Sequence, residues 1–118
     1  MKYALLIHDV PGQMEALDDA TRNSVYGEYF AVGQTPGIVG GEQLHPAQTS
    51  TTVRVQDGRT LTTDGPFADT KEVLGGYFVF EASNLDEVLE VAERIPAVRL
   101  GGAVEVRPLV EVPVEAAH

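Results

Sequence analysis

The segment DGPFADTKE, residues Asp64–Glu72, carries the strongest signal in this chain, and LGGY at Leu74–Tyr77 follows it after a single valine. The segment combines turn-forming residues, acids, a lysine and a glycine pair. It has neither the period of a helix nor that of a strand, so it specifies a local shape that presents polar groups. A segment of this kind indicates a functional site between two regular elements.

Before this segment, the sequence predicts a strand, a long helix and three shorter strands. Lys2–His8 has apolar side chains on both faces, which is typical of a central strand. Apolar residues recur at spacings of three and four over residues 13–33 and predict a helix, which Gly33 and Pro36-Gly37 end. The predicted buried stripe of this helix comprises Met14, Leu17, Thr21, Val25, Tyr29 and Val32, and its predicted water-facing residues are Glu15, Asp18, Asp19, Arg22 and Glu28. The shorter strands are predicted over Ile38–Leu44, Thr51–Gln56 and Arg59–Thr63, with a hairpin turn at Asp57-Gly58.

After the segment, the sequence predicts a strand, a helix and a last strand. Leu74–Ala82 is rich in aromatic and branched residues and predicts a buried strand. Ser83 and Asn84 are good caps for the helix that follows, and Pro96 closes it. The inner side of this helix is predicted to comprise Leu85, Val88, Leu89, Ala92 and Ile95. The last strand is predicted over Ala103–Val112, with valines on one face and Glu105, Arg107 and Glu111 on the other.

This order of elements predicts an α+β fold with a ferredoxin-like βαββαβ sheet and both helices on one face. Residues 1–112 are predicted to form a single domain, and residues 113–118 a flexible C-terminal tail. Apolar residues lie on both sides of several predicted strands, so the face opposite the helices needs a cover. We expect a second copy of the chain to provide it, which predicts a homodimer.

The segment Asp64–Glu72 resembles the signature of the YCII-related (YciI-like) family, in particular its DGPF-domain branch, which is named after the four residues Asp64–Phe67. Further matches lie at Lys2–Ile7, Gly41–Leu44 and Glu105–Pro108, so the resemblance covers nearly the whole chain. It implies a dimeric α+β barrel and is far more specific for family than for reaction.

Charge and composition exclude several classes of function. Eighteen acids against eight lysines and arginines give a formal charge of -10, which repels a phosphate backbone, so no direct nucleic-acid binding is predicted. Without cysteine, the chain has no disulfide and no thiolate nucleophile. The apolar start is too short for a signal peptide and no run of eighteen apolar residues occurs, which predicts a soluble cytoplasmic protein without membrane binding.

Metal and cofactor binding have no support in the sequence. The three histidines, His8, His45 and His118, show no ligand spacing with one another or with the acids, so no metal site is predicted. The glycine motifs of nucleotide-binding proteins and the nucleophile elbow of serine hydrolases do not occur in the sequence. No cofactor is therefore predicted.

The segment itself offers several candidate site residues, each with a structural alternative. Asp64 either fixes the turn by accepting backbone N–H bonds or serves as a base or ligand anchor. Lys71 and Glu72 are either a solvated charge pair, or they hold an anion and move a proton above a cleft. Phe67 is a candidate substrate contact within the same segment, whereas Asp69 replaces the glutamate that relatives of this branch commonly carry.

Outside the segment, His8 is the main candidate, because an imidazole titrates near neutral pH and can act as general acid or base. The resemblance implies a histidine and an aspartate as the proton-handling pair, which would assign the partner role to Asp64 or Asp9. Arg107 either pairs with Glu105 to align the last strand or binds a substrate carboxylate. Candidates of lower rank are Glu42, which follows two glycines, and His45.

Two functions from different classes remain open. The first is a cofactor-free enzyme that uses His8 with Asp64 or Glu72 in the isomerisation, elimination or dehalogenation of a small polar or aromatic acid, with Lys71, Arg107, Glu42 and Phe67 as substrate contacts. The second is a non-catalytic ligand-binding or regulatory accessory protein. Members of the branch that this chain resembles are often encoded beside extracytoplasmic-function sigma factors, which makes a sigma factor a possible partner.

Overall fold

The computed structural model describes residues 1–111, and its elements form a four-stranded sheet, a separate hairpin and two helices. The predicted tail at 113–118 and the predicted strand end at Val112 lie outside the described residues. The strands are β1 (Lys2–Asp9), β2 (Ile38–Gln43), β3 (Thr51–Gln56), β4 (Arg59–Asp64), β5 (Val73–Glu81) and β6 (Ala103–Pro108). The helices are α1 (Asp19–Gly33) and α2 (Leu85–Ala92), with short 3-10 helices η1 (Ala47–Thr49) and η2 (Pro96–Val98).

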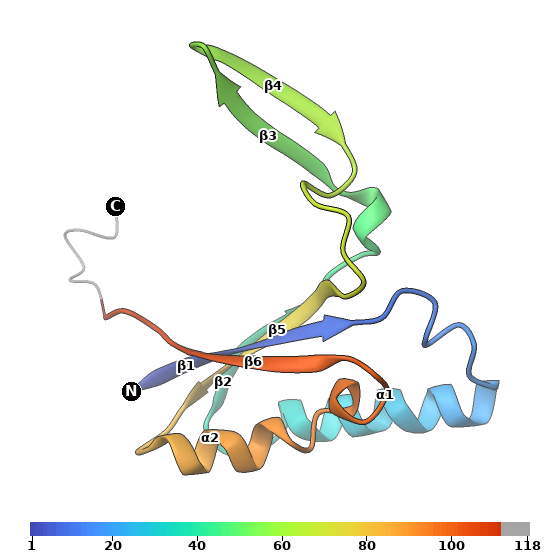
Figure 1. Cartoon of the computed structure of the whole chain (residues 1–118). Helices are drawn as coiled ribbons and strands as arrows, with labels where there is room; N and C mark the ends of the chain where they lie inside the picture. Colours follow the sequence, from blue (N-terminus) through green and yellow to red (C-terminus); the bar gives the residue numbers. More distant parts are fainter. Residues whose placement is uncertain (112–118) are drawn as a thin grey trace.

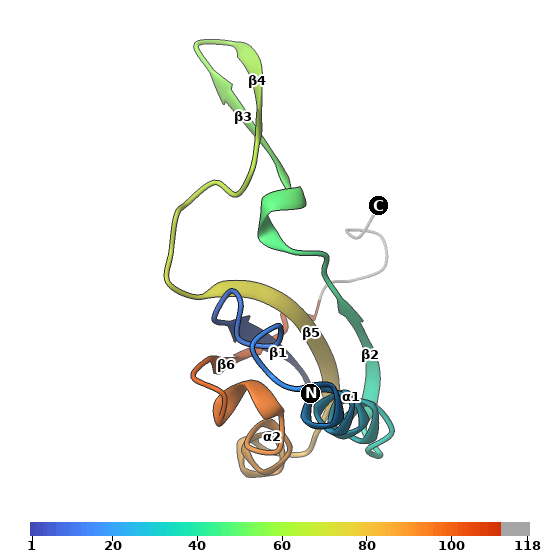
Figure 2. The ribbon, with the colours of Figure 1, turned by 90° about the vertical axis from the view of Figure 1, so that its right-hand side faces the viewer.

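The main sheet has the strand order β2-β5-β1-β6, and every neighbouring pair runs antiparallel. Both helices lie on one face of this sheet (Figures 1 and 2). The β3–β4 hairpin is inserted between β2 and β5, so the remaining elements keep the order βαββαβ. The predicted ferredoxin-like α+β fold is therefore confirmed, and β1 is a central strand as expected.

The hydrophobic core lies between the helices and one face of the sheet. Alternate residues of β1, namely Tyr3, Leu5 and Ile7, point into it, and Leu5 is completely buried. Phe80 of β5 and Val88 of α2 pack in the same cluster. In β6, Val104 and Val106 pack against this core, as the alternating pattern of that strand predicts.

The opposite face of the sheet carries the other half of each strand. Leu6 of β1 lies across from Tyr77, and Ala4 lies across from Val79. Leu6, Tyr77 and Val79 are partly exposed, and no described element covers them. This open face, defined here by Ala4, Leu6, Tyr77 and Val79, is consistent with the expected second copy but does not show one.

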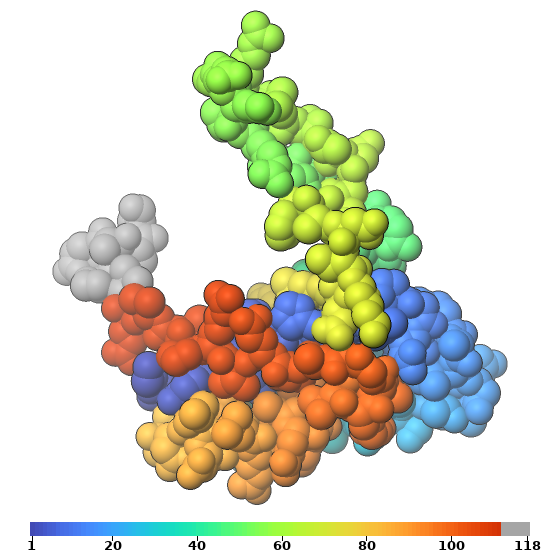
Figure 3. Space-filling view, in the orientation of Figure 1, coloured from blue at the N-terminus to red at the C-terminus, as the bar shows by residue number. Residues whose placement is uncertain are grey.

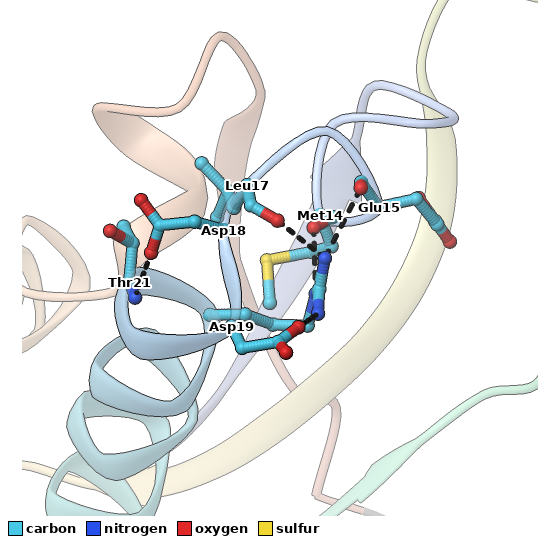
Figure 4. Close-up of polar contacts among 7 residues, drawn as sticks. Met14, Glu15, Leu17, Asp18, Asp19 and Thr21 are labelled. Atoms are coloured by element: carbon cyan, nitrogen blue, oxygen red, sulfur yellow. Dashed lines mark hydrogen bonds and ion pairs between the residues drawn. The ribbon is translucent and has the colours of Figure 1, made fainter.

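Helix α1 begins six residues later than the sequence pattern predicts. The Asp18 side chain caps it by accepting a hydrogen bond from the Thr21 backbone N–H at 2.7 Å, and residues 11–16 form turns instead. Arg22 holds these turns together, because its guanidinium donates to the carbonyl oxygens of Met14, Glu15 and Leu17 (Figure 4). The predictions that the helix starts at residue 13 and that Arg22 faces water are both wrong.

The second helix and the last strand also depart from prediction. Asn84 caps α2 by accepting from the Glu87 N–H at 3.0 Å, as predicted. However, Leu85 and Leu89 are about half exposed, and Val91 takes the predicted place of Leu89 in the core. Strand β6 ends at Pro108 rather than continuing through the predicted residues 109–111, although Leu109 N–H still donates to Lys2 O at 2.8 Å.

The β3–β4 hairpin stands clear of the body on the side of the sheet away from the helices (Figures 1 and 3). Asp57 and Gly58 have φ of 51° and 75°, the two positive values that a two-residue hairpin turn of this type requires, so the predicted hairpin is confirmed. The projecting hairpin raises the radius of gyration to 16.4 Å, compared with about 13 Å for a compact domain of this length.

Candidate functional site

A cavity of about 540 Å³ lies on the helix side of the sheet, between α1, the connection from β1 to α1, and the paired ends of β2 and β5. Segment 44–48 borders it as well. Its volume falls within the range of about 300–1,000 Å³ that small-molecule sites occupy. The cavity is therefore the candidate binding site for a small molecule.

Asp9, the last residue of β1, lines this cavity and is half-buried. A bulge in the pairing of β1 with β5 follows Ile7, so that His8 faces Leu74 and Asp9 faces Val73 while Gly75 has no partner. The Asp9 carboxylate fills the space where a side chain on Gly75 would lie. Burial raises the pKa of the Asp9 carboxyl above its usual value, although the nearby charge of His8 acts in the opposite direction.

Tyr29 of α1 lines the same cavity. Burial and then the negative charge of Asp9 raise the pKa of Tyr29 to about 12, so its hydroxyl keeps its proton at neutral pH. Tyr26 lies about one helical turn before Tyr29, and Phe30 is the residue after it. Both line the cavity as well. Phe30 is 71% exposed and Tyr26 47% exposed, so these rings form an aromatic wall rather than part of the core.

The remaining lining is mostly apolar or uncharged. Four glutamines contribute to it: Gln13, Gln34, Gln43 and Gln48. The turns at residues 11–16, which Arg22 holds together, contribute residues 11–15 to the lining, so the hydrogen bonds in Figure 4 fix part of the cavity wall. The acids among the lining residues are Asp9, Glu15 and Glu42, and none of the described lining residues is a lysine or arginine.

His8 lies on the open face, away from the cavity. Its Nε2 atom is 3.2 Å from Glu105 Oε1, and Glu105 Oε2 accepts a hydrogen bond of 2.9 Å from Arg107 Nε. Arg107, and to a smaller extent His8, lower the pKa of Glu105. The predicted pairing of Arg107 with Glu105 is confirmed, although the pair is exposed rather than internal.

Within the segment Asp64–Glu72, the main chain rather than Asp64 holds the turn. Gly65 N–H donates to Ser50 O at 2.7 Å, and the Thr52 hydroxyl donates to Gly65 O at 2.8 Å. The hydrogen bonds found among residues 1–111 include none to the Asp64 carboxylate. The interpretation that Asp64 fixes the turn through its side chain is therefore wrong.

The other predicted site residues do not lie together at one place within a single chain. Phe67 is 75% exposed and Lys71 is exposed, whereas Glu72 is half-buried beside the start of β5. Neither they nor Asp64 lines the cavity, but Glu42 and His45 do. Within the described part, no ion pair joins Lys71 to Glu72. A catalytic role for His8, Asp64 or Glu72 stays a prediction.

Asp9 and Tyr29 are the residues that sequence patterns rank too low. Asp9 follows His8 at the end of a strand and enters the sequence prediction only as its partner, although an acid just before Pro11-Gly12 is a signal of its own. The helical spacing assigns Tyr29 to the buried stripe of α1, which hides its hydroxyl. Neither pattern reveals that the two side chains meet at one cavity.

Among residues 1–111, no group of three or more histidine or acidic side chains could hold a metal ion. Nor does any helix in that part of the chain have the length and apolar character to cross a membrane.

Comparison with known proteins shows a family and a fold. The family model described as "YCII-related domain" matches residues 1–113. An uncharacterized protein of Rhizobium meliloti (strain 1021), R00369, is 40% identical over 88 residues, which cover 74% of this chain and 68% of that protein. The solved structure of 5-chloro-2-hydroxyhydroquinone dehydrochlorinase (TftG) from Burkholderia phenoliruptrix AC1100, in complex with 2,5-dihydroxybenzoquinone, has a TM-score of 0.55 and 21% identity, and the alignment covers 95% of this chain and 96% of the other.

Proposed function

The chain belongs to the YCII-related domain family, and we propose that it is a small-molecule enzyme of this family that works by acid–base chemistry without a cofactor. The observation that carries the proposal is the half-buried Asp9 carboxyl in an aromatic cavity, with its pKa raised by burial. An acid in a cleft whose pKa is raised by burial is a candidate for a functional residue. A general base is also most effective when its pKa lies nearer the working pH than that of a free carboxylate.

In this proposal, Asp9 removes a proton from the substrate, and Tyr29 donates a hydrogen bond to the oxygen on which negative charge develops. Tyr29 suits this role because its pKa of about 12 keeps the hydroxyl protonated. The aromatic wall formed by Tyr26 and Phe30 would hold the substrate's apolar body. Proton removal next to a leaving group gives elimination, and its return at another atom gives isomerisation.

The structural likeness to a dehydrochlorinase agrees with this class of reaction, since loss of hydrogen chloride is an elimination. At 21% identity the likeness extends to the fold, so the substrate of that enzyme is not transferred to this chain. The proposed reaction class rests on Asp9 and Tyr29, and the likeness in fold is secondary support for it.

The test is a screen of small ring compounds that carry an acidic C–H group, with exchange of that hydrogen for deuterium and halide release as readouts. Parent protein should give exchange or turnover with at least one compound, and Asp9→Asn should reduce the rate by at least about a hundredfold. Full activity in Asp9→Asn together with loss in His8→Gln would transfer the catalytic role to His8. Binding without any turnover would favour the alternative, a ligand-binding accessory protein, for which a sigma factor should co-purify.

A further inference from the structure

The charge of the cavity lining is one-sided. Asp9 lines a cavity whose described lining residues include two more acids, Glu15 and Glu42, and one histidine, His45, but no lysine or arginine. The whole chain carries a formal charge of -10, so its overall field has the same sign. A carboxylate ligand would therefore enter against both the local and the overall charge.

Two arginines near the cavity already have partners. Arg22 donates to the carbonyl oxygens of Met14, Glu15 and Leu17 and to the Asp19 carboxylate at 2.9 Å. Arg99, whose charge acts on Tyr29, forms an ion pair with Glu28. Neither guanidinium is placed to neutralise Asp9 in the resting protein.

The remaining lining suits a positive charge as well as an apolar body. Tyr26, Tyr29 and Phe30 follow one stripe of α1 along the cavity, and the faces of such rings attract an ammonium group. Phe30 is exposed and does not pack in the hydrophobic core, which is consistent with a role in contacting a ligand. The glutamine side chains of the lining supply amide oxygens that accept N–H hydrogen bonds.

We propose that the substrate of this cavity is a small amine that carries its positive charge on an ammonium group attached to an aromatic or other apolar body. This inference rests on the proposed function, because it names the substrate class for the same cavity. It replaces the expectation of a small polar or aromatic acid, for which the described lining residues offer no fork of positive charge.

An ammonium group also helps the proposed chemistry. Burial raises the pKa of Asp9, and only the ionised carboxylate can accept a proton. A positive charge within a few ångströms lowers the pKa of a carboxyl, so a bound amine would keep Asp9 ionised when it is needed. A neutral ligand of the same shape would lack this effect.

The experiment compares three probes of nearly equal size that differ in charge: 2-phenylethylamine, 2-phenylethanol and phenylacetate. Binding is followed by NMR titration of the parent protein through the backbone amides of Gly75 and Gly76, which line the cavity. We expect the amine to bind on the order of tenfold more tightly than the alcohol, and phenylacetate to bind more weakly than either. An equal or tighter affinity for phenylacetate, or no binding of the amine at millimolar concentration, would overturn the inference.

Two charge-matched variants separate the local effect from the overall charge. Asp9→Asn should bring the amine and the alcohol to within about twofold of each other, because the nearest negative charge is gone. Glu90→Gln removes one charge from the exposed side of α2, outside the cavity, and should keep the preference. An equal loss of preference in both variants, or a preference that survives in Asp9→Asn, contradicts a site at Asp9.

The outcomes also separate this inference from the proposed enzyme. Turnover that Asp9→Asn abolishes, combined with no preference for the amine, would leave the enzyme in place and reject the substrate class. Preference for the amine without turnover of any compound would keep the site and reject catalysis.

Discussion

The Oδ2 atom of Asp9 occupies the space that a Cβ atom on Gly75 would take. The glycine pair after the segment Asp64–Glu72 therefore does more than allow a turn. Its first member, Gly75, has no side chain and so leaves room for the carboxylate of Asp9 on the neighbouring strand β1. The bulge in β1–β5 pairing puts Gly75 opposite no residue of β1, which is what allows Asp9 to lean across it. The motif and the cavity are in this way connected, although the motif's own acids lie elsewhere.

The first prediction is that Gly75→Ala displaces the Asp9 side chain from the cavity. The added methyl group has no other obstacle, because the atoms near this Cβ position all belong to Asp9. We expect probe binding at the cavity to weaken by about tenfold or more, with the fold retained, in an NMR titration. Unchanged binding would show that Asp9 is not needed there.

A matched control for this substitution lies in α1. Gly27 sits inside the helix, and a methyl group added there would have no neighbouring atom within 4 Å. Gly27→Ala should raise the free energy of unfolding by roughly 0.5–1 kcal/mol, because alanine loses less backbone entropy in a helix. Chemical denaturation measures it, and a decrease would contradict the helical assignment at this position.

A second prediction concerns the stability of Asp9→Asn. The pKa of Asp9 is higher in the folded than in the unfolded chain, so folded protein holds its proton more tightly, and ionisation costs stability as pH rises. The variant should therefore melt at a higher temperature than the parent at neutral pH. The difference should vanish as pH falls below the ordinary carboxyl value of 3.8, where Asp9 is protonated in both states.

Thermal melts of both proteins across this pH range measure the effect. Equal melting temperatures at every pH would mean that Asp9 is not buried enough to matter. A gain in stability accompanied by a loss of ligand binding is the trade-off expected of a functional residue.

The third prediction is that Tyr29→Phe keeps the aromatic wall but removes the hydrogen-bond donor. We expect turnover of any substrate found in the screen to fall by about a hundredfold, with smaller changes in binding. Because the pKa of Tyr29 is about 12, the variant should show the same tyrosine absorbance change as the parent between about pH 8 and 10. A smaller absorbance change in the variant than in the parent over that pH range would mean that Tyr29 titrates there, which contradicts the burial of its hydroxyl.

The strands were predictable from sequence because their signals are local. Alternating residues in β1 and β6 and the Asp57-Gly58 turn each depend on a few neighbours, and all three appear as expected. The start of α1 was not predictable in the same way. Met14 and Leu17 continue the helical spacing, yet Asp18 offers a side-chain cap, and Arg22 gives the preceding carbonyl groups another partner.

The site was less predictable because it depends on contacts between distant parts of the chain. The environment of Asp9 comes from a bulge against β5 and from Tyr29 on α1, and neither is visible in the residues next to Asp9. In contrast, the segment Asp64–Glu72 is conspicuous in sequence, but its side chains lie outside the cavity of a single chain. A strong local signal thus identified the family, whereas the candidate site depends on tertiary packing.

The fourth prediction is that the protein is a homodimer joined through the open face. Val79 lies on this face and is partly exposed, although it sits in a central strand. Static light scattering at micromolar concentration should give twice the mass of one 12.7 kDa chain. Val79→Glu should shift the protein toward the monomer, since a charge would be buried at the contact.

Leu89→Glu is the control for this experiment. It adds the same charge at an exposed position on α2, on the other side of the sheet, and should remain dimeric. A monomeric parent, or equal dissociation in both variants, would rule out the open face as the contact.

The last prediction decides between the two faces of the sheet as the place of chemistry. His8, Glu105 and Arg107 form a connected polar set on the open face, whereas Asp9 and Tyr29 meet at the cavity on the helix side. Because β1 points successive side chains to opposite faces, His8 and Asp9 are neighbours in sequence but lie on opposite sides of the sheet. We expect His8→Gln to leave probe binding at the cavity within about twofold of the parent and to weaken the dimer. We expect Asp9→Asn to weaken probe binding at the cavity and to leave the dimer intact. NMR titration and light scattering on both variants give the two readouts. If His8→Gln instead abolished ligand binding and left the dimer intact, the open face would carry the site, and the cavity would lose its claim.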